Sequence, residues 1–169
     1  GITRVVNGPI PYTPDGLPLI GPMPGVPNAF EACVFTFGIV QAGGAGRLLA
    51  EIIIEGEAES DSWAVDPRRF TDHVDTAYTA AKAIETYSHE YAMHFPQIQW
   101  PAGRKSKYSP LYDRLAAAGA EFGSYGGWER ADWFPANAAD RRPADSYDRQ
   151  HWFDAVGDEC RHVASHAGI

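Results

Sequence analysis

The first 27 residues limit the fold more than any other segment, because they hold seven of the chain's thirteen prolines. Proline removes a backbone N–H donor and clashes with the preceding helical turn, and glycines are interspersed with these prolines. A long helix is therefore excluded there, and we expect short strands joined by turns. The expected strands cover residues 2–6, 17–20 and 29–35, with a turn at Pro14-Asp15-Gly16.

A glycine-rich stretch, Gln41 to Gly46, follows the third expected strand, and we expect it to form a turn before a helix that ends at Gly56. This order would direct a helix N-terminus and several backbone N–H groups to one place, where anionic groups bind well. The stretch matches neither GxGxxG nor the P-loop pattern, so close packing of helix on sheet is the alternative explanation for its glycines. The apolar face of the expected helix is Ala45, Leu48, Leu49, Ile52 and Ile53.

The remainder of the chain predicts helices and one aromatic, strand-like stretch. Apolar residues at helical spacing predict a long helix over 72–95, a shorter one from Ser109 to Gly119, and a last one over 153–167. Residues 122–134 are expected to form strands, and 137–147 a polar linker. The predicted fold class is therefore α+β. The apolar positions of the long and the last helix are Ala77, Ala81, Ile84, Tyr87 and Tyr91, and Phe153, Val156, Cys160, Val163 and Ala167.

Composition and charge exclude several classes of function. The net charge of -8 argues against nucleic acid as the main partner, because phosphate binding relies on clustered Lys and Arg. The most apolar run, 48–54, is interrupted by Glu51 and is too short to span a bilayer, so we expect no membrane partner. Two cysteines, without a paired CxxC, favour a reducing compartment, and we expect a cytoplasmic protein.

Local motifs assign no catalytic residue and no metal site. His162 and His166 lie four residues apart and could share a helix face near Cys160, but no acidic residue completes a HExxH-like pattern. A pair of surface histidines is the interpretation that we prefer, and no metal is expected. The chain contains no G-x-S-x-G elbow, which argues against a hydrolase. Arg68 and Arg69, which follow Asp66-Pro67, indicate a helix start with an ion pair.

The order of segments carries a more specific signal than any single motif. Residues 7–57, which include TPDGLPLIGPMPG and TFGIVQAGGAG, resemble the closing part of the FAD-binding domain in the dimethylglycine and sarcosine dehydrogenase family. The stretches DPRRF, SPLYDRL and GWERADWF resemble that family's central domain, and residues 152–169 resemble its lead into a folate-binding, aminomethyltransferase-like domain. The resemblance implies domain ranges of 1–60, 61–147 and 148–169.

The resemblance implies an FAD-dependent oxidoreductase that removes a hydride from the N-methyl carbon of a small amine, such as dimethylglycine or sarcosine, to flavin N5. The family's dinucleotide fingerprint is not found in this sequence, and the first residue is Gly1 instead of Met. We therefore expect an internal fragment that is inactive by itself, with tetrahydrofolate as a further cofactor only of the missing domain. The alternative is a non-catalytic interaction or assembly module derived from the family, which could self-associate through surfaces normally covered by missing domains.

The resemblance also implies the residues that contact the flavin. In the family, the matching turn lays its backbone along the flavin ring, and the following helix directs its dipole to the pyrimidine edge. Related amine oxidases often have Gly at the Thr36 position and a Lys near Val40 that binds the substrate carboxylate, so this chain is expected to bind a different amine or to hold its carboxylate elsewhere. The implied cofactor-binding residues are Thr36, Phe37, Gly38, Ile39, Val40 and Gly43.

Overall fold

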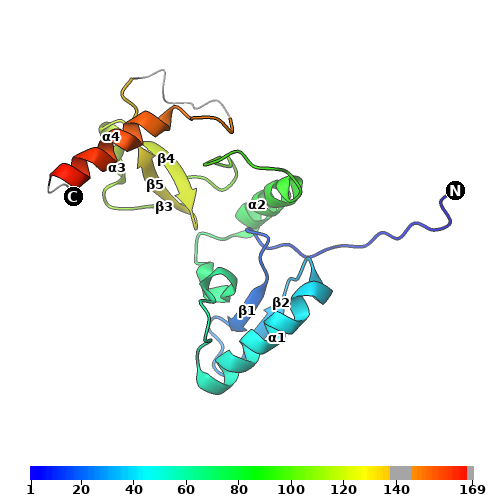
Figure 1. The fold of residues 1–169 in the computed structure, drawn as a ribbon. Coiled ribbons are helices and arrows are strands. Elements are labelled where there is room, and N and C mark those ends of the chain that lie inside the picture. The colour runs from blue at the N-terminus through cyan, green and yellow to red at the C-terminus, as the bar shows by residue number, and fades with distance from the viewer. Residues whose placement is uncertain (138–145, 167–169) are drawn as a thin grey trace. The chain divides into compact units, whose positions relative to one another are not determined.

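The computed structural model of the chain describes residues 1–137 and 146–166, and it contains both helices and strands, which confirms the α+β class (Figure 1). Two units form, Gly1–Glu90 and Tyr91–Ile169, and each has its own small sheet. The expected linker falls mostly on residues 138–145, and the last expected helical position is Ala167; both lie outside the described residues. No described helix is both long and apolar enough to cross a membrane.

The proline-rich segment of the N-terminal unit forms one hairpin. Strands β1 (Leu19–Pro22) and β2 (Phe30–Cys33) pair antiparallel, with Leu19 opposite Cys33 and Pro22 opposite Phe30. The expected strand over residues 2–6 is wrong, because this segment has neither helix nor strand and its side chains are exposed. A strand needs a neighbouring strand for its backbone hydrogen bonds, and the described residues supply none there.

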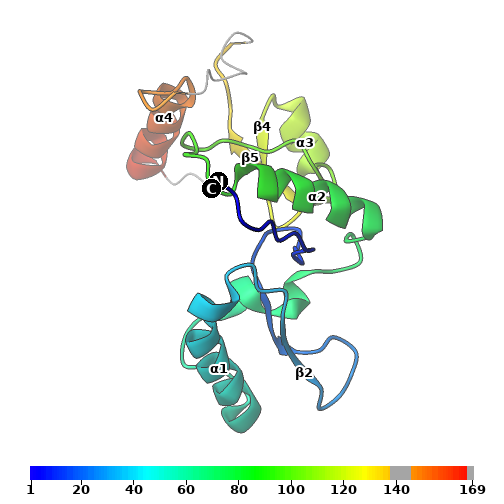
Figure 2. The same cartoon turned by 90° about the vertical axis from the view of Figure 1, so that its right-hand side faces the viewer.

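Helix α1 (Gly38–Glu55) begins earlier than expected, so Gly43, Gly44 and Gly46 lie inside the helix and not in a turn before it. Propensity argued for a turn, but a helix can carry these glycines because its other face packs on a sheet. Figure 1 and Figure 2 show α1 running alongside β1 and β2. Ala45 and Ile52 are buried there, whereas Ile53, expected on the same face, is half exposed. Gly56 ends α1 in the left-handed conformation, as expected, and donates its N–H to the Ile52 carbonyl.

Two short 3-10 helices, η1 (Trp63–Val65) and η2 (Pro67–Arg69), lead to helix α2 (Thr76–His89). The Asp75 side chain accepts a hydrogen bond from the N–H of Tyr78 at 2.7 Å, and this N-cap starts α2 later than the predicted 72–95. The predicted apolar side is exposed: Ile84 is 68% exposed. The opposite side packs on the unit instead, where Thr86 Oγ1 donates to the Pro14 carbonyl at 3.0 Å.

The C-terminal unit is built on a three-stranded sheet of order β3-β5-β4. Strand β3 (Lys107–Tyr108) runs parallel to β5 (Trp128–Trp133), and β4 (Glu121–Tyr125) is antiparallel to it, which confirms the expected aromatic strands. Gly126 and Gly127 join β4 to β5, and both have positive φ, as a two-residue type I′ turn requires. Two helices complete this unit, α3 (Tyr112–Ala117) and α4 (Trp152–Ser165).

The apolar core of the described residues is small. Helix α4 leaves its expected apolar face largely open, because Phe153, Cys160 and Val163 are exposed. Each unit also contains a polar network with a buried member, around Asp66 in the first and Glu129 in the second. The buried apolar side chains of the described part of the chain are Ile20, Ala45, Ile52, Ala120 and Trp133.

Candidate functional site

The six residues implied as flavin contacts lie together where β2 leads into α1. Thr36 and Phe37 form the end of the turn, and the next three residues are the first turn of the helix. Gly43 follows one turn later, inside α1. The structure thus brings the predicted residues to one helix start, although that start lies at Gly38 and not after the glycine-rich stretch.

Three backbone donors are available at this helix start. The first hydrogen bond of α1 runs from the N–H of Gln41 to the Phe37 carbonyl at 3.2 Å, so the N–H groups of Gly38, Ile39 and Val40 precede it. Phe37 occupies the N-cap position, where its side chain accepts no hydrogen bond, and the first turn carries no acidic residue. The positive end of the helix dipole therefore has no counter-charge from within its own first turn.

The surface around these donors is open and apolar. Ile39 is 96% exposed, and Val40 and Phe37 are exposed beside it. A methyl group added at Gly43 would meet no atom within 4 Å. Backbone donors next to exposed apolar side chains suit a flat ring with a polar, electron-rich edge. A flavin has that character, so the residues present fit the group that the resemblance implies.

Val34 is a residue that sequence reasoning missed. It directly follows β2 and has φ 59°, a left-handed conformation that a β-branched residue rarely adopts. Such strain persists only where the surrounding structure imposes it, and it occurs often at functional sites. The local sequence gives no signal for it, since valine ordinarily favours extended backbone.

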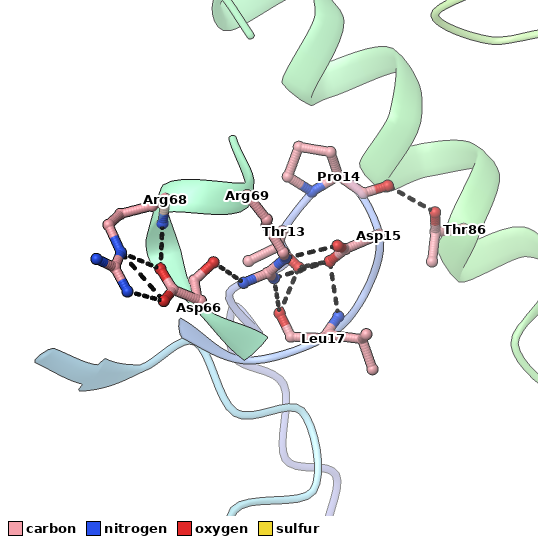
Figure 3. A network of polar contacts seen from close by, with 8 residues as sticks. All are labelled: Thr13, Pro14, Asp15, Leu17, Asp66, Arg68, Arg69 and Thr86. Carbon is pink, nitrogen blue, oxygen red and sulfur yellow. Dashed lines mark hydrogen bonds and ion pairs between the residues drawn. The ribbon is translucent and has the colours of Figure 1, made fainter. Parts of the chain in front are cut away.

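A second missed feature is the Arg69 network, which fixes the loop before β1 (Figure 3). Arg69 Nε and Nη2 donate to the Asp15 carboxylate at 2.8 and 3.0 Å, and Nη2 also donates to the Leu17 carbonyl at 2.9 Å. Arg69 Nη1 donates to the Asp66 carbonyl at 3.1 Å. Each guanidinium nitrogen thus has a protein acceptor, so Arg69 orders the loop before β1 and is not a ligand-binding group.

The expected ion pair after Pro67 is confirmed, within one segment. Asp66 is buried and accepts hydrogen bonds from Arg68, from the side chain at 2.6 Å and from the backbone N–H at 2.7 Å. The hydrogen bond from the Arg68 side chain lowers the pKa of the Asp66 carboxyl, although burial opposes this effect. Asp66 therefore stays ionised and caps η2.

The histidines and cysteines do not gather into a site. His162 and His166 stack with ring centroids 4.6 Å apart on the exposed surface near the end of α4. Cys33 and Cys160 are free thiols. Among residues 1–137 and 146–166, no three His, Cys, Asp or Glu side chains are grouped so that they could hold a metal ion.

Comparison with known proteins matches two family models. Residues 55–109 match the FAD dependent oxidoreductase central domain, and residues 111–169 match the GCVT N-terminal domain. The two matches meet inside the range 61–147 that we expected for one domain.

Three relatives illustrate what the chain is similar to. It is 38% identical over 169 residues to mitochondrial dimethylglycine dehydrogenase of Homo sapiens. That match covers 99% of this chain and 19% of that protein. It is 39% identical to 4-methylaminobutanoate oxidase (formaldehyde-forming) of Paenarthrobacter nicotinovorans, over 100% of this chain and 20% of that one. It is 30% identical to the mitochondrial pyruvate dehydrogenase phosphatase regulatory subunit of Mus musculus, and the match covers 95% of this chain and 19% of that protein. The chain thus spans about a fifth of the length of these relatives.

Proposed function

Because the chain belongs to the dimethylglycine and sarcosine dehydrogenase family, we propose that it is one part of an FAD-dependent oxidoreductase that acts on the N-methyl group of a small amine. In this proposal the N-terminal unit contains the end of the flavin domain, and the chain continues through the central domain into the start of a folate-binding domain. Dimethylglycine, sarcosine or another N-methylated amino acid is the proposed substrate class, and the cytoplasm is the proposed compartment.

The start of α1 would bind the pyrimidine edge of the flavin. FAD, when bound, would supply the hydride acceptor of the reaction and would carry negative charge at its pyrimidine edge once reduced. The N–H groups of Gly38, Ile39 and Val40 would donate hydrogen bonds to that edge and stabilise the charge. The observation that carries the proposal is the helix start without a capping side chain, where three donors lie beside exposed apolar residues.

The chain by itself should not hold the cofactor firmly, because one helix start contacts only one edge of so large a ligand. We expect a mixture of purified chain and FAD to separate on gel filtration, with no flavin absorbance in the protein peak. Tight stoichiometric binding of FAD by the chain would overturn the proposal that its flavin site is incomplete.

A pair of helical glycines tests the site in the longer protein. Gly43→Ala should weaken FAD retention at least tenfold there, because its methyl group would enter the space proposed for the ring. Gly46→Ala is the matched control, since it also meets open space but lies further along α1. In the isolated chain both variants should stabilise α1 by about 0.5–1 kcal/mol, because alanine favours helix over glycine. Equal FAD retention in both variants would place the flavin elsewhere.

A second candidate function is a non-catalytic assembly module, favoured by the similarity to a regulatory subunit and by the outer face of α1. That face carries Val40, Gly43, Arg47, Ala50 and Ile54, all exposed. A module of this kind would self-associate through it, so sedimentation of the chain should show a dimer that Ile54→Glu dissociates. A monomer at all concentrations would contradict this candidate.

A further inference from the structure

The two family segments do not coincide with the two structural units. The family matches meet between residues 109 and 111, whereas the units meet between Glu90 and Tyr91. The last part of the central-domain segment, residues 91–109, therefore lies in the same unit as the GCVT segment. The contacts that hold it there determine where the folded chain can open.

The first of these contacts is a shared sheet. Strand β3, from the central-domain segment, pairs in parallel with β5 from the GCVT segment. The N–H of Lys107 donates to the Gly127 carbonyl at 3.0 Å. Because a parallel pair needs a long crossover connection, α3 and β4 lie in the chain between the two strands. The point where the two family matches meet, between residues 109 and 111, is called the family boundary below. The sheet thus contains strands from both sides of it.

The second contact is the Arg104–Glu129 pair. Arg104 Nε and Nη2 donate to the two carboxylate oxygens of Glu129 at 2.8 and 2.6 Å, and Nη2 also donates to the Phe122 carbonyl at 2.9 Å. The Glu129 side chain is 1% exposed. A bidentate pair in which the carboxylate is cut off from water resists opening, because the carboxylate is not easily rehydrated.

The loop before β3 makes two more bonds to the hairpin. Lys105 has φ 62°, an unfavourable backbone for a residue other than glycine, and its N–H donates to Glu129 Oε1 at 2.7 Å. Gln99 Oε1 accepts a hydrogen bond from the N–H of Ser124 at 2.8 Å, which satisfies a backbone donor of β4. All these bonds cross the family boundary.

We propose that residues 99–108 are a structural part of the GCVT segment, held by the Arg104–Glu129 pair, so that the folded chain opens first near residues 90–91 and not near residue 110. If the proposed function holds, Arg104 and Glu129 are positioning residues that fix the last part of the central-domain segment, residues 91–109, to the folate-binding domain of the enzyme. No contact in this argument involves the start of α1. A failure of flavin binding and a failure of this proposal are therefore distinguishable.

Limited proteolysis of the full chain with chymotrypsin tests the proposal directly, because one tyrosine lies at the junction of the units and another lies in β3. Tyr91 is 83% exposed at the junction of the units, and Tyr108 is 46% exposed in β3. Exposure alone would allow cleavage at both. We expect cleavage after Tyr91 to be at least tenfold faster than after Tyr108, because β3 must leave the sheet before it can enter a protease. Equal rates, or faster cleavage after Tyr108, would overturn the proposal.

Substitution of Glu129 or Arg104 provides a second test in the same proteolysis experiment. Glu129→Gln should speed cleavage after Tyr108 at least tenfold and leave cleavage after Tyr91 unchanged, and Arg104→Lys should have an intermediate effect. Asp154→Asn is the matched control, because it removes an exposed ion pair with Arg149 in the same unit and should change neither rate. Unchanged cleavage after Tyr108 in a folded Glu129→Gln variant, as judged by circular dichroism, would show that the pair does not hold the loop. Were that variant unfolded, the wild-type rates alone would still decide the proposal.

Discussion

Each of the two units uses an arginine to join segments that lie far apart in the sequence, but the carboxylates they bind differ in exposure. In the N-terminal unit, Arg69 binds Asp15, whose side chain is 38% exposed. In the C-terminal unit, Arg104 binds Glu129, whose side chain is almost fully buried. If its arginine is lost, the Asp15 carboxylate can be hydrated by water, whereas the Glu129 carboxylate cannot. The units should therefore respond differently to the loss of their networks.

The two units also differ in net charge. Residues 1–90 carry five basic and twelve acidic residues, whereas residues 91–169 carry nine and ten. The excess acid of the N-terminal unit is concentrated in exposed loops such as 55–61. Solvent screens exposed charges, so an ion pair in the acidic N-terminal unit should add less to its stability than the buried pair adds to the C-terminal unit.

The largest effect is expected from Glu129→Ala, which should lower the free energy of unfolding of the C-terminal unit by about 3–5 kcal/mol, because the Arg104 charge is left without its partner. Urea unfolding followed by tryptophan fluorescence measures it, since four of the five tryptophans lie in residues 91–169. Asp154→Ala, at an exposed pair, should stay within about 0.5 kcal/mol of wild type. An equal loss in both variants would remove burial as the explanation.

A smaller effect is expected from Arg69→Lys in the N-terminal unit, about 1–2 kcal/mol, because an ammonium group cannot reproduce the planar contacts to Asp15, Leu17 and Asp66. Hydrogen exchange of the Gly16 and Leu17 amides should become faster. Arg47→Lys, in an exposed pair, is the matched control. If Arg69→Lys cost as much as Glu129→Ala, the two networks would not differ as the comparison states.

Acid should weaken the C-terminal unit through Glu129. The hydrogen bonds from the Arg104 side chain, joined by one from the Lys105 backbone, lower the pKa of Glu129 below its usual value, although burial opposes them. A lowered folded-state pKa contributes stability that is present above about pH 4.5, the range of the unfolded carboxyl, and is lost as the pH falls through the folded value. Burial raises the pKa of Asp132, so its protonation has the opposite sign. The fluorescence-detected stability should therefore fall below pH 4.5, and Glu129→Gln should flatten this dependence.

The smallest expected difference lies within the N-terminal unit, between two glycines of similar backbone. Gly16 has φ 76° and Gly25 has φ 74°, so alanine is strained at both. A methyl group at Gly16 would lie 2.9 Å from Thr86 Cγ2, whereas at Gly25 it would meet nothing within 4 Å. Gly16→Ala should therefore cost about 1 kcal/mol more than Gly25→Ala in thermal unfolding. Equal costs would show that α2 does not press on this turn.

Local rules predicted the elements whose own residues decide them. The Gly56 helix end and the aromatic strands follow from spacing and helix-end chemistry, whereas the Gly126-Gly127 hairpin turn was not predicted. The helix through Gly43 to Gly46 was missed, because packing of α1 on the hairpin outweighs the low propensity of glycine. The exposed face of α2 was missed for a related reason. An apolar stripe predicts burial, but the residues described here place the other face of α2 against the Pro14 loop.

The residues of the candidate site were named by resemblance, whereas the sequence pattern predicted only a helix start with backbone donors. Thr36 to Val40 contribute backbone groups, so their side chains carry little information about a ligand. The Arg69 network and the Arg104–Glu129 pair join residues 54 and 25 positions apart. Sequence spacing gives no rule for such contacts, because only the completed fold brings the partners together.

The strand order of the C-terminal sheet has a consequence for synthesis on the ribosome. The central strand, β5, is the last of the three to be made, and both β3 and β4 pair only with it. The tight Gly126-Gly127 turn lets β4 and β5 close within microseconds once Trp133 has emerged. Until then β3 has no strand to pair with, and the Arg104 side chain remains hydrated because Glu129 has not yet been synthesised. The C-terminal unit should therefore acquire its sheet late and in a single step.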